Sequence, residues 1–111
     1  MKATELRIDN WVKWNYEESS DGNAYPVEFG YELDDIKNNP NIVKPIPLTE
    51  EWLVKFGFEN NSMNLDEEGF LHLDISFIGG VNVYINDMEY PHINHVHQLQ
   101  NLYFALTGQE L

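Results

Sequence analysis

Hydrophobic and polar residues alternate most clearly over residues 70–87. The apolar positions in this stretch are Leu71, Leu73, Ile75, Phe77, Val81, Val83 and Ile85. A two-residue turn at Gly79-Gly80 would put the apolar rows of the two strands on opposite faces of a hairpin. A three-residue loop instead pairs Ile75 with Val83 and brings both rows to one face. The pattern therefore predicts a hairpin with an odd-length loop and a glycine in a left-handed conformation.

A second hairpin is predicted near the N-terminus. A first strand covers residues 6–14 and is split by a turn or bulge at Asp9-Asn10. The Ser-Asp-Gly-Asn turn sequence at residues 20–23 then joins residues 14–18, the first arm of the hairpin, to residues 24–33, the expected second arm. Pro26 removes a backbone N–H from this arm, so we expect the arm at a sheet edge.

Two helices are predicted from their capping residues and apolar stripes. The first covers Thr49–Phe56, with Thr49 as N-cap and Gly57 as the left-handed residue after the helix. The second covers residues 94–107, with Asn94 as N-cap. Its apolar stripe, which indicates a face buried in the core, consists of Val96, Leu99, Leu102, Tyr103 and Leu106.

These elements predict a single α+β domain over residues 1–111. The chain is long enough for one hydrophobic core, and it contains no internal repeat or linker. We expect a curved antiparallel sheet packed against helices at about 49–56 and 94–107. Short strands and the split first strand favour closure of this sheet into a small Src-homology-3-like barrel, by analogy with other barrels of this size.

Charge changes the picture of what the domain binds. Nineteen acidic residues against six basic ones give a net charge of −13. The last basic residue is Lys55, and every aspartate or glutamate after it stands without a lysine or arginine to balance it. Direct binding to DNA or RNA needs a basic footprint, so it is not expected. An acidic surface fits a cationic protein partner, or simply keeps the protein soluble.

Other bulk features exclude further classes. There is no cysteine, which removes disulfide and thiolate chemistry. The N-terminal residues have no apolar signal region, and no apolar run reaches membrane-spanning length. We therefore expect a cytoplasmic protein without membrane contact.

Three histidines, His92, His95 and His97, raise the question of a metal site. Two helical positions separate His95 from His97 by about 200° around the axis, so they are expected to point apart. His92 remains able to approach His95. We predict surface or capping histidines, with no metal ligand, no cofactor and no catalytic residue. A metal-dependent enzyme that uses His92 and His95 is the least favoured alternative.

The face of the C-terminal helix opposite its apolar stripe is unusual for so acidic a chain. No lysine, arginine, aspartate or glutamate occurs from residue 94 to residue 107. This second face carries His97, Gln100, Asn101 and Phe104, which form the candidate interaction surface. A semi-polar, uncharged face indicates a second contact. That contact is either an intramolecular layer or a partner, such as a second copy of the chain.

Three motifs carry a family resemblance. The stretches KATELRIDNWV (2–12), PIPLTEEWLVKFGF (45–58) and VHQLQNLYFALTGQEL (96–111) cover roughly a third of the chain. They resemble a family of small uncharacterised bacterial and phage-encoded proteins with an ELRIGNWV start, a PIPLTEEWL helix and a VHQLQNLYFALTG ending. That pattern has glycine at the position of Asp9, which supports a turn there. Of the three clustered histidines, only His97 matches it, and the resemblance transfers no catalytic residue.

The leading functional expectation is a small acidic, non-enzymatic protein-interaction module of phage or mobile-element type. It would associate with itself or bind a protein partner through the uncharged face of the C-terminal helix. The alternative from a different class is an acidic inhibitor that mimics nucleic acid and occupies the groove of a basic protein.

Overall fold

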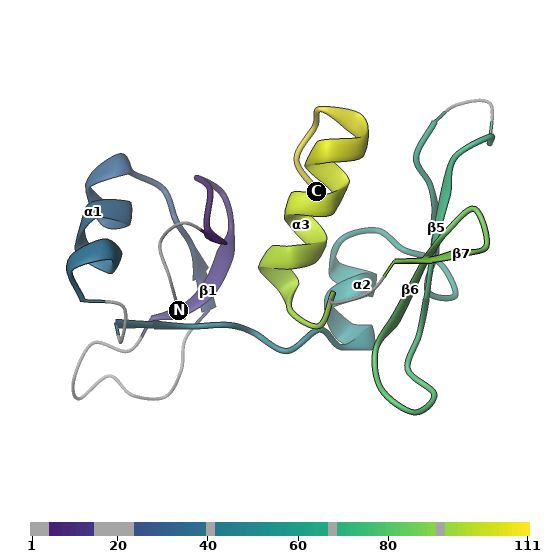
Figure 1. Ribbon diagram of the computed structural model, residues 1–111, viewed down its shortest axis with the longest axis horizontal. Coiled ribbons are helices and arrows are strands. Elements are labelled where there is room, and N and C mark those ends of the chain that lie inside the picture. Colours follow the sequence, from purple (N-terminus) through teal and green to yellow (C-terminus); the bar gives the residue numbers. More distant parts are fainter. Residues whose placement is uncertain (1–4, 15–23, 40–41, 67–68, 91–92) are drawn as a thin grey trace.

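The computed structural model describes residues 5–14, 24–39, 42–66, 69–90 and 93–111. Within them, two antiparallel sheets and three helices form an α+β fold (Figure 1). The strands are β1 (Trp11–Trp14), β2 (Ala24–Pro26), β3 (Val43–Lys44), β4 (Ser62–Asn64), β5 (His72–Ser76), β6 (Asn82–Ile85) and β7 (Met88–Tyr90). The helices are α1 (Gly30–Asn38), α2 (Glu50–Lys55) and α3 (Val96–Thr107).

The N-terminal lobe consists of a sheet in the order β2-β1-β3 and of α1. The first strand is split as predicted, because Asp9 adopts a φ of 77° and β1 begins only at Trp11. Pro26 ends β2, which lies at the edge of the sheet, so this prediction is also confirmed. The part of the predicted first arm beyond Trp14 (residues 15–18) and the turn sequence between β1 and β2 lie outside the described residues. The core of the lobe consists of Leu6, Val12, Trp14, Val27, Ile36 and Val43.

The expected extended arm over residues 24–33 is wrong beyond Pro26, because α1 begins at Gly30. The Glu32 carboxylate explains this start: its Oε1 accepts hydrogen bonds from the backbone amides of Glu28 and Phe29, both at 3.0 Å. An acidic side chain in the first turn also interacts favourably with the partial positive charge at the N-terminus of the helix. Ile36 then turns inward and is fully buried.

The C-terminal lobe contains the meander β4-β5-β6-β7 together with α2. The predicted register is confirmed, because Ile75 pairs with Val83 and the strands are joined by an odd-length loop. Gly79 and Gly80 in that loop have φ values of 73° and 118°. One sheet face is buried through Leu73, Ile75 and Val83.

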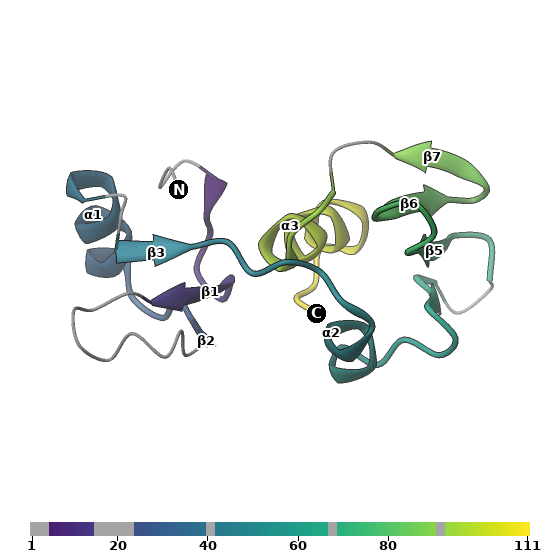
Figure 2. The same cartoon turned by 90° about the horizontal axis from the view of Figure 1, so that it is seen from below.

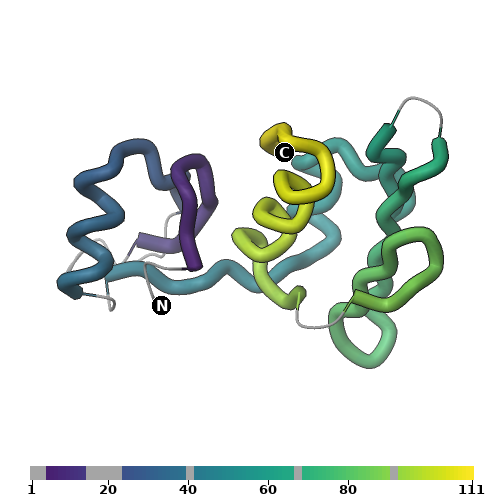
Figure 3. The backbone as a smooth tube through the Cα atoms, turned by 45° about the horizontal axis from the view of Figure 1, so that its top comes forward, coloured from purple at the N-terminus to yellow at the C-terminus, as the bar shows by residue number. Residues whose placement is uncertain are grey.

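The two sheets do not close into a barrel, so the expected Src-homology-3-like closure is wrong. Each sheet instead buries one face within its own lobe, and α3 lies between the two sheets (Figure 2). The chain crosses from one lobe to the other between β3 and α2 and passes beneath α3 (Figure 3). The resulting molecule is elongated, with extents of 44 × 29 × 22 Å.

The helix ends follow local hydrogen bonding. α2 is bounded as predicted, with Thr49 as N-cap, although the Thr49 side chain makes no capping bond to the described helix. After α2, Gly57 has a φ of 94° and the amide of Phe58 donates to Leu53 O at 2.9 Å.

α3 begins later than predicted, at Val96, with His95 rather than Asn94 as its N-cap. The backbone at His95 is held extended because the amide of Val96 donates to Ile46 O at 2.9 Å and the amide of Leu48 donates to Asn94 O at 3.0 Å. Among the described residues, no helix is both long enough and apolar enough to cross a bilayer.

Two glycine substitutions should change stability in opposite directions. Gly57→Ala should lower the free energy of unfolding by about 1 kcal/mol, because a left-handed φ disfavours a side chain. The new Cβ would lie 3.9 Å from the Met63 side chain, so backbone strain rather than a clash is tested. Gly30→Ala, at the start of α1 with open space around its Cβ, should raise stability by about 0.5–1 kcal/mol. Urea denaturation measures both, and equal effects would contradict the assigned conformation of Gly57.

Candidate functional site

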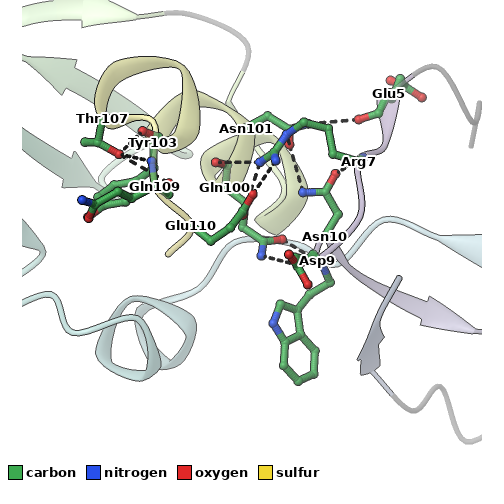
Figure 4. A network of polar contacts seen from close by, with 11 residues as sticks. Glu5, Arg7, Asp9, Asn10, Gln100, Asn101, Tyr103, Thr107, Gln109 and Glu110 are labelled. Atoms are coloured by element: carbon green, nitrogen blue, oxygen red, sulfur yellow. Dashed lines mark hydrogen bonds and ion pairs between the residues drawn. The ribbon is translucent and has the colours of Figure 1, made fainter. Parts of the chain in front are cut away.

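The second face of α3 contacts the segment that precedes β1, and Gln100 lies at the centre of this contact. Its side chain is 1% exposed. Gln100 Oε1 accepts a hydrogen bond from the amide of Trp11 at 2.8 Å, and Nε2 donates to Asp9 O at 2.9 Å (Figure 4). Both ends of one amide therefore bind backbone groups on either side of Asn10, directly after the Asp9 turn.

Asn101 extends the contact toward the N-terminus. Its Nδ2 donates to Glu5 O at 3.0 Å. Its Oδ1 accepts from Arg7 Nε at 2.7 Å and from Asn10 Nδ2 at 2.9 Å. Asn10 is itself fully buried, and its Oδ1 accepts from the amide of Arg7. Side-chain amides from both partners thus form one continuous network.

Arg7 covers the outer part of this face. Its guanidinium carbon lies 4.2 Å from the centre of the Phe104 ring, which places a cation over an aromatic face. Arg7 Nη1 also pairs with Glu110 Oε1 at 2.5 Å. Both ion-pair partners are partly solvent-exposed, so this pair adds on the order of 0–1 kcal/mol. Phe104 remains 40% exposed.

The structure therefore assigns an intramolecular partner to the candidate interaction surface. Of its four residues, His97 and Gln100 are buried, Asn101 is bonded to residues 5–10, and Phe104 is stacked by Arg7. An intramolecular layer thus covers most of this face, and a partner at the exposed part of Phe104 stays an untested prediction. No local pattern of residues indicates which segment forms this layer.

A second contact joins the lobes through aromatic rings. Trp11 of β1 and Trp52 of α2 meet edge to face, with ring centres 5.5 Å apart. The Lys55 ammonium lies 3.9 Å from the Trp11 ring centre and 4.6 Å from that of Trp52. Periodicity alone could not have found this cluster, because Trp11 and Lys55 are far apart in the sequence.

The histidine cluster differs from the prediction. His95 and His97 were expected to point apart, but their rings stack with centres 5.9 Å apart and an angle of 17° between planes. The helical rotation does not apply, because His95 is the extended N-cap with a φ of −128°. His92 lies outside the described residues, so the His92/His95 pair stays an untested prediction.

His97 is buried in an unusual way. It is 3% exposed, and neither ring nitrogen has a hydrogen-bond partner within the described part of the chain. Burial lowers the pKa of His97 below its ordinary value; the nearby negative charge of Glu5 opposes this shift, and His95 adds to it. The imidazole is thus held neutral near pH 7.

One group of side chains in the described residues could offer three ligands to a metal ion. His72, Asp74 and Asp87 place ligand atoms within 4.8 Å of one another. His72 Nε2 lies 3.4 Å from Asp74 Oδ2, and the Ser62 hydroxyl donates to the other oxygen of Asp74. Exposed groups of this kind are common without an ion. This cluster could not be predicted from the sequence, because only the turn between β6 and β7 brings Asp87 close to His72 and Asp74 of β5.

A different surface was also missed, at the start of α1. Phe29 and Tyr31 are 51% and 64% exposed, and their rings stack with centres 5.3 Å apart. Exposed carboxylates border the pair, because Asp34 and Asp35 lie one helical turn beyond Tyr31. We call Glu28, Phe29, Tyr31, Asp34 and Asp35 the α1 patch. The sequence pattern does not reveal this patch, because it predicts an extended strand over residues 24–33.

Replacing Gln100 tests the contact between α3 and the N-terminal segment. Gln100→Met keeps the side-chain length but leaves Asp9 O and the Trp11 amide without partners. The free energy of unfolding should fall by about 1–3 kcal/mol, since two hydrogen bonds between a buried side chain and partly buried backbone groups are lost. Hydrogen exchange at the Trp11 amide should accelerate. The control Gln109→Met, at an exposed position, should change stability by less than about 0.5 kcal/mol. A similarly small loss in Gln100→Met would contradict the assigned role.

The pH dependence of stability tests the environment of His97. Its folded-state pKa lies below the unfolded value of about 6.5, so the unfolded chain takes the proton first. This residue's contribution is therefore complete above about pH 6.5 and is lost as the pH falls toward the folded-state pKa. Denaturation of the wild type and of His97→Gln over this range should show the loss in the wild type alone. Parallel curves would refute the burial effect, and titration of the ring proton by NMR gives the pKa directly.

The function of this chain has to be inferred from the geometry of these contacts. Comparisons with protein-family models, with curated proteins and with solved structures found no match to the chain. The three motifs described above therefore stay a resemblance, and the function follows from the chemistry of the described surfaces.

Proposed function

We propose that the protein is a small, non-enzymatic interaction module that binds an arginine-rich segment of a basic protein through the α1 patch. This proposal includes the accessory role of phage or mobile-element type that we expect from the resemblance of its motifs to small uncharacterised bacterial and phage-encoded proteins. The single observation that carries the proposal is the stacked, exposed pair of Phe29 and Tyr31 beside exposed carboxylates.

The chemistry of the patch fits guanidinium groups better than other partners. An arginine side chain stacks on an aromatic face and also pairs with carboxylates through two parallel hydrogen bonds. Residues 28–38 contain a single basic residue, Lys37, against four acidic ones, which are Glu28, Glu32, Asp34 and Asp35. The net charge of −13 adds long-range attraction for a cationic partner.

A second copy of this chain is a poor occupant of the same patch. Association of two α1 patches would bring their carboxylates together, and the whole chains repel each other. The uncharged face of α3, where the sequence placed self-association, is already in contact with residues 5–11. A basic partner therefore suits the described surface better than a homodimer.

Binding of short labelled peptides tests the proposal. An arginine-glycine repeat should bind more tightly than a lysine-glycine repeat of equal length, because lysine cannot stack in the same way. The double variant Phe29→Ser/Tyr31→Ser should weaken arginine-peptide binding by about 5- to 30-fold. The control Phe70→Ser/Ile78→Ser removes two exposed apolar side chains from the other lobe and should leave binding unchanged.

The same titration separates this proposal from nucleic-acid mimicry. Mimicry depends on carboxylates and not on the aromatic pair. Binding that survives loss of Phe29 and Tyr31 but falls in Asp34→Asn/Asp35→Asn would therefore replace the proposed stacking by charge alone. Equal affinity for the arginine and lysine peptides, or binding to neither, would overturn the proposal.

A further inference from the structure

A cavity of about 350 Å³ lies along one side of α3, away from the α1 patch. Its volume falls in the range of cavities that hold small molecules. Three of its polar residues, His97, Gln98 and Asn101, come from α3, and Glu5 of the N-terminal segment adds a fourth. The cavity is therefore a product of the docked N-terminal segment and not of α3 alone.

His97 is the residue of this wall that most needs an explanation. It is buried, and within the described residues both of its ring nitrogens lack a hydrogen-bond partner. The neighbouring amides have other partners: Gln98 Oε1 accepts from the amides of Asn94 and His95, and Asn101 is bonded at both ends to residues of the N-terminal segment. A buried polar group without a partner is destabilising, and such groups often mark a site for a missing bonded molecule.

The protonation state of the imidazole limits which hydrogen-bonding groups that molecule can carry. Burial holds His97 neutral near pH 7, so one ring nitrogen donates and the other accepts. A carboxamide offers both a donor and an acceptor and can therefore bond to either tautomer. An anion is disfavoured, because Glu5 lies in the wall and the whole chain carries a charge of −13.

The rest of the wall is apolar or aromatic. Ile93, Leu102 and Ala105 line it, and Tyr90 of β7 adds a ring. Such a lining contacts the hydrophobic body of a ligand while a few polar groups fix its orientation. We propose that this cavity binds a small uncharged molecule that joins a carboxamide to an aromatic or similarly apolar ring, with the carboxamide bonded to His97.

Binding should also change the position of the His97 ring. Both nitrogens are shielded in the described structure, and the ring stacks on His95 with centres 5.9 Å apart. A ligand therefore reaches a nitrogen by turning the imidazole toward the cavity and weakening this stack. Signals of both histidine rings are expected to respond, which gives the proposal a readout inside the site.

Titration of ¹⁵N-labelled protein with benzamide tests the proposal. Benzamide should shift the His97 ring nitrogen signals in a saturable way, with a dissociation constant of about 1 mM, as expected for a fragment of this size. Benzoate carries the excluded charge, and toluene lacks the polar pair. Each should bind at least about tenfold more weakly.

Two variants locate the binding. His97→Phe should abolish the saturable response observed at backbone amides lining the cavity. Ala105→Trp fills the cavity from an exposed helix position, so it tests the site even where His97→Phe does not fold. The control Gln109→Trp adds the same ring outside the cavity and should bind benzamide normally.

Three results would overturn the proposal. They are no saturable shift with benzamide, equal binding by Ala105→Trp and the wild type, or benzoate binding as tightly as benzamide. The first would mean that the cavity holds only water. Because no residue of the α1 patch lines the cavity, failure here leaves the arginine-peptide test unaffected, and the reverse also holds.

Discussion

The arrangement of the two lobes depends on the buried amide of Gln100. The apolar cores are separate: the cluster around Ile36 belongs to the N-terminal lobe, and the cluster around Leu99 belongs to α3 and the C-terminal lobe. Gln100 crosses between them and satisfies two backbone groups that a turn would otherwise leave unpaired. A polar contact of this kind specifies one docking geometry more narrowly than an apolar one, because both donor and acceptor must meet their partners.

This contact also explains why α3 carries an amide and not a carboxylate at the position of Gln100, although the chain is strongly acidic. A carboxylate at the position of Gln100 could accept a hydrogen bond from the Trp11 amide, but it could not donate to Asp9 O, and it would be buried as a charge. An amide satisfies both. The acidic residues are instead placed where solvent or a cationic partner reaches them, as at the exposed Asp34 and Asp35. The second face of α3 thus holds the lobes together.

Local features of the fold could be predicted where a short-range rule decides them. The register of the β5–β6 hairpin followed from a period of two and a glycine loop, since any other register would expose the apolar row. The split before Trp11 followed from a polar pair inside a strand pattern. α1 could not be recognised in this way, because Pro26 and the aromatic residues Phe29 and Tyr31 favour an extended chain. Capping by the Glu32 carboxylate and burial of Ile36 outweighed that preference.

The need for a second neighbour of α3 can be recognised from the residues alone, because an uncharged face rich in amides is not typical of a solvated helix. That residues 5–11 are this neighbour becomes visible in the folded molecule. Asn101 and Glu5 lie at opposite ends of the chain, and hydrogen bonds between distant segments leave no periodic trace in a sequence. The stacked rings of His95 and His97, the cavity beside them and the closeness of Asp87 to His72 also depend on how the chain packs, so they could not be predicted from spacing. Spacing governs neighbours along a helix or strand, whereas packing of whole elements governs neighbours across the molecule.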